Sequence, residues 1–136
     1  MAQPKLTNTW SHFWILISIK LCLKVKTNNF DELNFFAEVK KRPNMFFGKP
    51  SILSLRDFIA GMGHAFSSCN CENQFKLFYS FTQWYYNNLT DKNGYACWWN
   101  HITYISGGDD TAAFHSFFRI FEQYLKDVHN VSLPET

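Results

Sequence analysis

Residues 111–128, TAAFHSFFRIFEQYLKDV, decide the fold of this chain. Apolar side chains recur three and four positions apart in this stretch, which is the period of an amphipathic α-helix with one buried face. The predicted inward side chains are Phe114, Phe117, Phe118, Phe121, Leu125 and Val128. The predicted outward side chains are His115, Arg119, Glu122 and Lys126. Glu122 and Lys126 also have the spacing of a stabilising ion pair within one helix.

The same period predicts four further helices on the N-terminal side of this segment. They span residues 30–42, 51–66, 72–89 and 97–105. The first has Asp31 and Glu32 in its first turn, where the helix dipole favours acids. Helix 72–89 carries aromatic rings on more than one stripe, which indicates several packed neighbours. The sequence therefore predicts a mainly α fold, an irregular single-domain bundle of about five helices.

Helix 51–66 has two possible N-cap residues at its start and two glycines in its second half. The side-chain oxygen of Ser51 or Ser54 can accept a hydrogen bond from an otherwise unpaired backbone amide at the start. Gly61 and Gly63 each cost about 1 kcal/mol relative to Ala inside a helix. They indicate either close packing against another helix or fraying toward the C-terminal end.

Length and composition favour one globular domain with an aromatic core. The chain has 136 residues, of which 46% are hydrophobic and 19% aromatic. Its net charge is +2, but residues 1–26 contain four lysines and no acid, whereas five acids and two bases follow residue 100. An acidic C-terminal third binds nucleic acid poorly, because that binding needs Lys and Arg at the phosphates. It suits a basic protein partner.

Residues 1–28 are predicted to form an extension that precedes a helical domain of residues 29–136. Residues 10–23, WSHFWILISIKLCL, are apolar but fall short of the ~20 residues of a membrane-spanning helix. From residue 17 to 26, apolar and polar side chains alternate, which is the period of a β-strand. We expect a strand or an extended arm and no stable membrane insertion. A short anchor that tethers a helical adaptor is the alternative.

Histidine and cysteine residues offer two candidate chemical sites. His64, Cys69 and Cys71 could contribute to a zinc site, but zinc needs three or four converging ligands and Cys-x-Cys alone is a weak signal. Cys97 and His101 are four residues apart on one predicted helix, yet nucleophilic catalysis also needs a group that orients the histidine. We therefore predict no metal, no cofactor and no enzymatic activity. A small hydrolase that uses Cys97 and His101 is kept as an alternative.

The four cysteines are read as reduced thiols, because a chain of this size folds without disulfide bonds. Reduced thiols indicate a cytoplasmic location.

A series of motifs resembles a known family. In chain order, they are Arg42-Pro43-x-Met45-aromatic-x-Gly48, Ser51–Leu55 with an apolar helix to Gly61, Phe81-x-x-Trp84, Trp98-Trp99, Gly108-Asp109-Asp110 and Ala113-Phe114-x-x-Phe117-Phe118. Their order over residues 30–128 resembles the immunity proteins of bacterial contact-dependent growth inhibition and related polymorphic toxin systems.

The resemblance implies a non-catalytic inhibitor that binds the C-terminal domain of a cognate toxin, as a monomer or a homodimer in the cytoplasm. Many such toxins are nucleases with basic surfaces, which an acidic face would complement. The inhibitor itself is expected to make no direct contact with nucleic acid. The residues expected to bind the toxin are Asp109, Asp110, Glu122 and Asp127, through charge, and Trp99, as an aromatic anchor.

Overall fold

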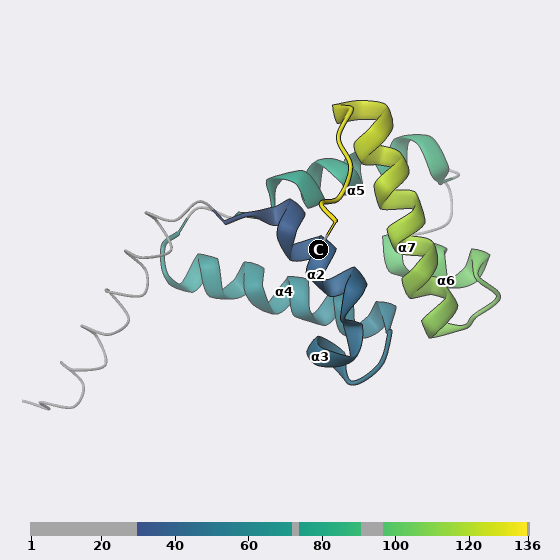
Figure 1. Cartoon of the computed structure of the whole chain (residues 1–136), viewed down its shortest axis with the longest axis horizontal. Coiled ribbons are helices and arrows are strands. Elements are labelled where there is room, and N and C mark those ends of the chain that lie inside the picture. Colours follow the sequence, from purple (N-terminus) through teal and green to yellow (C-terminus); the bar gives the residue numbers. More distant parts are fainter. Residues whose placement is uncertain (1–29, 72–73, 91–96, 136) are drawn as a thin grey trace, which may run out of the picture.

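Figure 1 shows the computed structural model of the chain, which describes residues 30–71, 74–90 and 97–135. In these ranges the chain forms six α-helices and one π-helical segment, and no β-strand. They are α2 (Glu32–Lys41), α3 (Pro43–Phe47), α4 (Ile52–Ser68), α5 (Lys76–Leu89), α6 (Trp98–Ile105), α7 (Asp110–Tyr124) and the π-helix η1 (Leu125–His129). The predicted mainly α, single-domain bundle is confirmed. The predicted N-terminal strand or arm lies outside the described residues.

Helix α7 is the element on which the others pack. It contacts α4, α5 and α6, and Phe121 on its inner face lies 4.7 Å from Phe36 of α2 between ring centroids. The side chains of α7 and η1 that are at most 2% exposed are Ala113, Phe114, Phe117, Phe118, Phe121, Tyr124 and Leu125. Aromatic rings therefore make up most of the centre of the fold, as the composition predicts.

The predicted burial of apolar side chains in the last helix is wrong at its C-terminal end. Val128 is 50% exposed, although its spacing predicts burial. The backbone is π-helical from Leu125 to His129, and the wider turn of a π-helix breaks the 3.6-residue period. Tyr124, which the pattern does not select, is buried, and its hydroxyl lies 2.8 Å from Nε2 of His129.

The expected packing at the glycines of α4 is also wrong. A Cβ atom at Gly61 would meet nothing within 4 Å, and one at Gly63 would lie 3.6 Å from the Tyr79 hydroxyl, an ordinary contact. The helix does not fray there either, because it continues to Ser68. Nothing in the structure explains Gly61.

Candidate protein-binding surface

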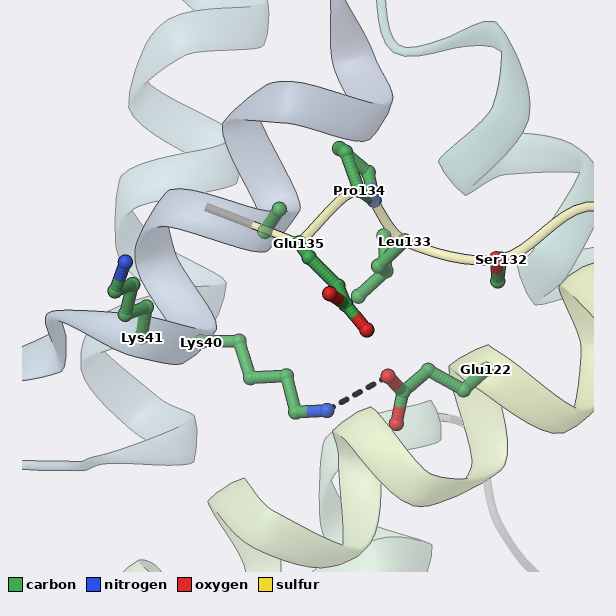
Figure 2. A pocket seen from close by; sticks show the side chains of 8 residues that line it. Lys40, Lys41, Glu122, Ser132, Leu133, Pro134 and Glu135 are labelled. Atoms are coloured by element: carbon green, nitrogen blue, oxygen red, sulfur yellow. Dashed lines mark hydrogen bonds and ion pairs between the residues drawn. The ribbon is translucent and has the colours of Figure 1, made fainter.

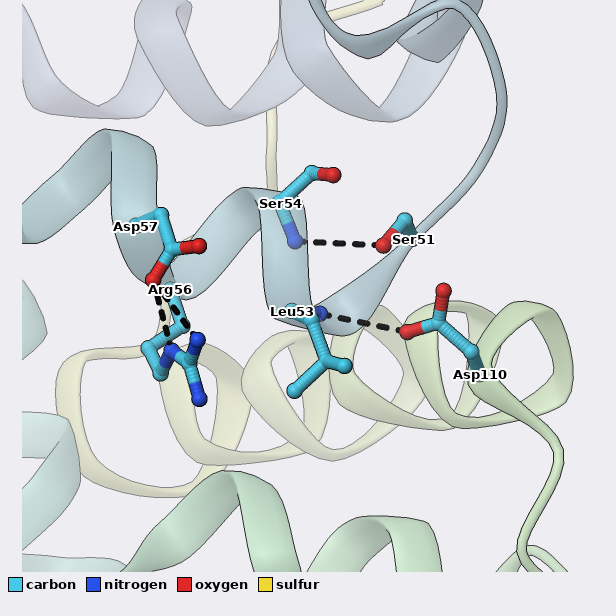
Figure 3. A network of polar contacts seen from close by, with 6 residues as sticks. All are labelled: Ser51, Leu53, Ser54, Arg56, Asp57 and Asp110. Atoms are coloured by element: carbon cyan, nitrogen blue, oxygen red, sulfur yellow. Dashed lines mark hydrogen bonds and ion pairs between the residues drawn. The ribbon is translucent and has the colours of Figure 1, made fainter.

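Asp109 and Asp110 lie where the starts of α4 and α7 meet. Asp109 is the N-cap of its own helix, because its Oδ1 accepts a hydrogen bond from the Ala112 amide at 2.6 Å. Asp110 extends instead toward α4, where its Oδ1 accepts from the Leu53 amide at 3.2 Å (Figure 3). Ser51, the N-cap of α4, accepts from the Ser54 amide at 3.1 Å. The first residue of α7 therefore helps to cap α4.

The charge of Asp110 is stabilised by this arrangement. Partial burial acts to raise the pKa of the Asp110 carboxyl, but hydrogen bonds from the Ser51 side chain and from the amides of Leu53 and Ile52 act in the opposite direction. The nearby Lys49 ammonium adds to them, and the pKa lies below its ordinary value. Asp110 is therefore an ionised cap at neutral pH.

Glu122 lies near the C-terminal end of α7, and Asp127 lies in η1, away from Asp109 and Asp110 at the start of α7. Asp110 and Glu122 are twelve residues apart on α7, which corresponds to about 18 Å along a helix axis. Glu122 pairs with Lys40 of α2 at 2.6 Å rather than with Lys126, and Asp127 accepts from the Gln123 side chain at 2.8 Å. The structure therefore does not bring the four predicted acids together on one face.

The Lys40–Glu122 pair lies beneath the C-terminal segment, which turns back from η1 toward α2 (Figures 1 and 2). Residues 132–135 line an open cavity of about 570 Å³ together with Ala37, Lys40, Lys41 and Glu122. Two lysines and two glutamates contribute to this lining. The cavity therefore presents no single sign of charge.

Trp99 is the fifth residue predicted to bind the toxin. It is half-buried, and its ring contacts the guanidinium of Arg56. Cζ of Arg56 on α4 lies 5.2 Å from the centre of the Trp99 ring, within range of a cation–π interaction. Nε and Nη2 of Arg56 both lie 2.8 Å from Oδ1 of Asp57, which fixes the guanidinium in place (Figure 3). Arg56 of α4 therefore lies over the ring of Trp99, which belongs to α6.

Leu53 completes the surface at this junction. It lies three and four positions before Arg56 and Asp57, so the three side chains share one side of α4. Leu53 is 44% exposed, and its amide is the group bonded to Asp110. We call Leu53, Arg56, Asp57 and Trp99 the Leu53 surface. Sequence reasoning found Trp99 and the adjoining Asp110 but missed Leu53 and Arg56, because nothing in the sequence pairs α4 with α6.

The predicted pairing of Cys97 and His101 takes a different form. Cys97 is the residue before α6, and its carbonyl oxygen accepts from the His101 amide at 3.3 Å. The side chain of His101 has another neighbour, since its Nδ1 lies 2.6 Å from the hydroxyl of Tyr85 on α5. Burial, and then the nearby Tyr86, raise the pKa of Tyr85, which keeps the phenol protonated. Tyr85 and His101 are 16 residues apart on different helices, so the sequence pattern missed this contact.

The three residues considered as possible zinc ligands, His64, Cys69 and Cys71, do not form such a site. Within residues 30–71, 74–90 and 97–135, no group of three or more His, Cys, Asp or Glu side chains could hold a metal ion. The Cys71 thiol is buried and donates to the carbonyl oxygen of Cys69 at 3.5 Å, whereas His64 is exposed.

No helix in the described part of the chain is both long and apolar enough to cross a membrane. No known family, curated protein or solved structure matches this chain. That the chain is an immunity protein therefore stays a prediction from the order of its motifs.

Proposed function

We propose that the chain is an immunity protein that binds and neutralises a cognate toxin domain of a contact-dependent growth inhibition system in the cytoplasm. The toxin domain, which we expect to be a nuclease, is the partner, and the chain itself performs no catalysis. The order of the motifs between Arg42 and Phe118 supports this proposal.

The single observation that carries the proposal is the Leu53 surface. Trp and Arg are enriched among the residues that dominate binding energy in protein interfaces. Here Arg56 is already held by Asp57 over the Trp99 ring, with 32% of its side chain exposed. Fixing a long side chain before binding lowers the entropic cost of association. A partner with a matching surface would therefore meet an ordered anchor with an exposed leucine beside it.

The aromatic core suits a binder that must act as a rigid body. Phe36, Phe81 and Phe117 are 0% exposed, and they belong to one continuous cluster with rings from α2, α5 and α7. Closely packed interiors have low compressibility, so a body of this kind resists deformation. Bound to a toxin domain, such a body would block the approach of substrate by its bulk, without a chemical step.

Co-expression in a sensitive bacterium tests the function. The cognate toxin domain is induced alone, with the wild-type chain, or with Trp99→Ala. We expect the wild type to restore growth, and Trp99→Ala to restore it less. Tyr104→Ala is the matched control, because Tyr104 is 68% exposed at the other end of the same helix. Toxicity that is unchanged by a folded, abundant wild-type chain would contradict the proposal.

A further inference from the structure

Cys69 and Cys71 lie in the turn that ends α4. Cys69 is the C-cap of that helix, and Asn70 after it has a φ of 50°, in the left-handed region that reverses the direction of the chain. The Cys71 amide donates to the carbonyl oxygen of Phe66 at 2.9 Å, which closes the turn. The two cysteines therefore belong to one hydrogen-bonded turn at the end of a helix.

The backbone of this turn suits a disulfide bond between the two side chains. Residues two positions apart in a chain have Cα atoms separated by at most about 7 Å, and a turn shortens this distance. A disulfide bond joins Cα atoms that are about 4.4–6.8 Å apart. The Cys71 thiol also lies against residue 69, because it donates to the Cys69 carbonyl oxygen at 3.5 Å. Forming the bond therefore requires rotation of side chains and no unfolding of α4.

The two thiols differ in their access to solvent. Cys69 is partly exposed, whereas Cys71 is 8% exposed and belongs to the core cluster. Both are free thiols in the structure. Redox-sensing cysteines are accessible to the oxidant and often have a second, resolving cysteine beside them. The partly exposed Cys69 fits the first of these roles, and the buried Cys71 fits the second.

We infer that Cys69 and Cys71 form a redox-active dithiol, which small-molecule disulfides of the glutathione class oxidise. The Cys69 thiolate attacks one sulfur of glutathione disulfide, whose S–S bond breaks as a bond between Cys69 and glutathione forms. The glutathione that leaves takes up the proton that Cys69 lost. The Cys71 thiolate then attacks Sγ of Cys69, and the second glutathione leaves with the proton of Cys71. Both protein thiols are thereby oxidised, and glutathione disulfide is reduced to two glutathione molecules.

The bond between Cys69 and Cys71 should be reversible. It closes a ring across a single intervening residue, which forces the disulfide away from its preferred geometry. Strained disulfides are reduced more readily than structural ones, so an excess of reduced glutathione should restore both thiols. Leu53 lies sixteen residues before Cys69, which corresponds to about 24 Å along a helix axis. The dithiol is therefore separate from the Leu53 surface, and its chemistry does not depend on toxin binding.

The intact mass of the full chain tests the inference without any toxin. Cys22→Ser/Cys97→Ser keeps Cys69 and Cys71 as the two remaining thiols. This variant is incubated with excess glutathione disulfide at mildly alkaline pH, where thiolates are populated, and is quenched with acid. We expect each thiol to lose its hydrogen, fragmentation to place the bond between residues 69 and 71, and excess reduced glutathione to reverse it. Free thiols, retained glutathione, a link to a second chain, or a bond that reduced glutathione does not reverse would overturn the inference.

Removing one thiol at a time tests the order of the two steps. In the same background, Cys71→Ser should keep one glutathione on Cys69, because the thiol that displaces it is absent. Cys69→Ser should react about tenfold more slowly than Cys71→Ser, because its remaining thiol is buried. Equal rates in the two variants would overturn the role of Cys69 as the attacking thiol. Peptide mapping of the oxidised wild-type chain locates the same bond without substitutions, in case a variant does not fold.

Cys97 provides the matched control. It is also partly exposed, but it is the N-cap of α6 and has no second cysteine near it in the sequence. A variant that keeps Cys97 alone, with serine at positions 22, 69 and 71, should stop at the stage of bound glutathione. Release of glutathione from this control at the rate seen with the dithiol would show that Cys71 is not needed, and would overturn the inference.

Discussion

Two pairs of consecutive acids, Asp31-Glu32 and Asp109-Asp110, begin α2 and α7 in the same way. The first acid of each pair caps its own helix through the amide three residues later. Oδ1 of Asp31 lies 3.0 Å from the Asn34 amide, and Oδ1 of Asp109 lies 2.6 Å from that of Ala112. The first members are therefore ordinary N-caps.

The second acid of each pair caps another helix. Glu32 accepts from the amides of Leu77 and Phe78 at the start of α5, at 2.9 and 2.6 Å. Asp110 accepts from the Leu53 amide at the start of α4. One pair therefore joins α2 to α5, and the other joins α7 to α4. Each carboxylate satisfies amides that the helix itself leaves unpaired.

The pairs differ in how deeply the second acid is buried. Glu32 is 9% exposed, and burial raises its pKa despite the two amide hydrogen bonds. Burial acts on Asp110 in the same direction, but its hydrogen bonds and Lys49 outweigh it, and the pKa falls. The amide hydrogen bonds therefore favour the carboxylate at both sites, but burial outweighs them at Glu32 and does not at Asp110.

The largest effect is expected from removing the buried cap. Glu32→Ala leaves the amides of Leu77 and Phe78 without an acceptor and opens a small cavity. We expect the free energy of unfolding to fall by about 2–4 kcal/mol. Urea denaturation measures this change, and Glu38→Ala is the control, since among the described residues the Glu38 carboxylate makes a loose 3.8 Å ion pair with Arg42 and caps no other helix. Equal losses in the two variants would show that the cap contributes little.

The contribution of Glu32 to stability should decrease as the pH rises, which is opposite to the usual behaviour of a hydrogen-bonded carboxylate. The pKa of Glu32 in the folded chain lies above the ordinary 4.5, so the folded state holds this proton more tightly than the unfolded state. Its contribution to stability is full below pH 4.5 and is lost as the pH rises through the folded pKa. We expect the stability difference between wild type and Glu32→Gln to change in that window and to stay constant above it. A difference that grows only below pH 4.5 would mean that the pKa is lowered.

A smaller loss is expected at the surface cap. Asp110→Ala should lower the free energy of unfolding by about 1–2 kcal/mol and speed hydrogen exchange at the Leu53 amide. The wild-type advantage should disappear as the pH falls from the ordinary 3.8 through the lower folded pKa of Asp110. Unchanged exchange at Leu53 would contradict the contact between α7 and α4.

The smallest effects are expected from the first members of the pairs. Asp31→Ala and Asp109→Ala should each cost about 1 kcal/mol, because each removes one local cap. Faster hydrogen exchange should be confined to the first turns of α2 and α7. Loss of protection in α5 or α4 would show that the two members of a pair do not act separately.

The helical fold could be predicted from the sequence because its signals are local. The period of 3.6 residues selects Phe114, Phe117 and Phe121 as core residues, and residue type and position narrow the cap of α4 to Ser51 or Ser54, of which the structure uses Ser51. Partners far apart in the chain could not be predicted this way. Glu32 and Phe78 are 46 residues apart, and their contact depends on how α2 and α5 pack.

The candidate site was only partly predictable for the same reason. Trp99 was selected by residue type, and Asp110 by its place beside Asp109. The pattern could not show that Glu122 pairs with Lys40, 82 residues away, or that Arg56 covers Trp99. Residue type therefore identifies candidates, whereas tertiary packing determines which groups are engaged inside the fold.

The most direct test of the claim that the acids of α7 act inside the fold is the toxin affinity of the double variant Asp109→Asn/Asp110→Asn. Asparagine keeps a side-chain oxygen that can cap a helix and removes both charges. Affinity is measured by calorimetry on protein shown to be folded. We expect unchanged binding, because both carboxylates accept hydrogen bonds from helix amides of the chain itself. Binding at least tenfold weaker, with stability retained, would show that these charges contact a basic toxin and would contradict the claim.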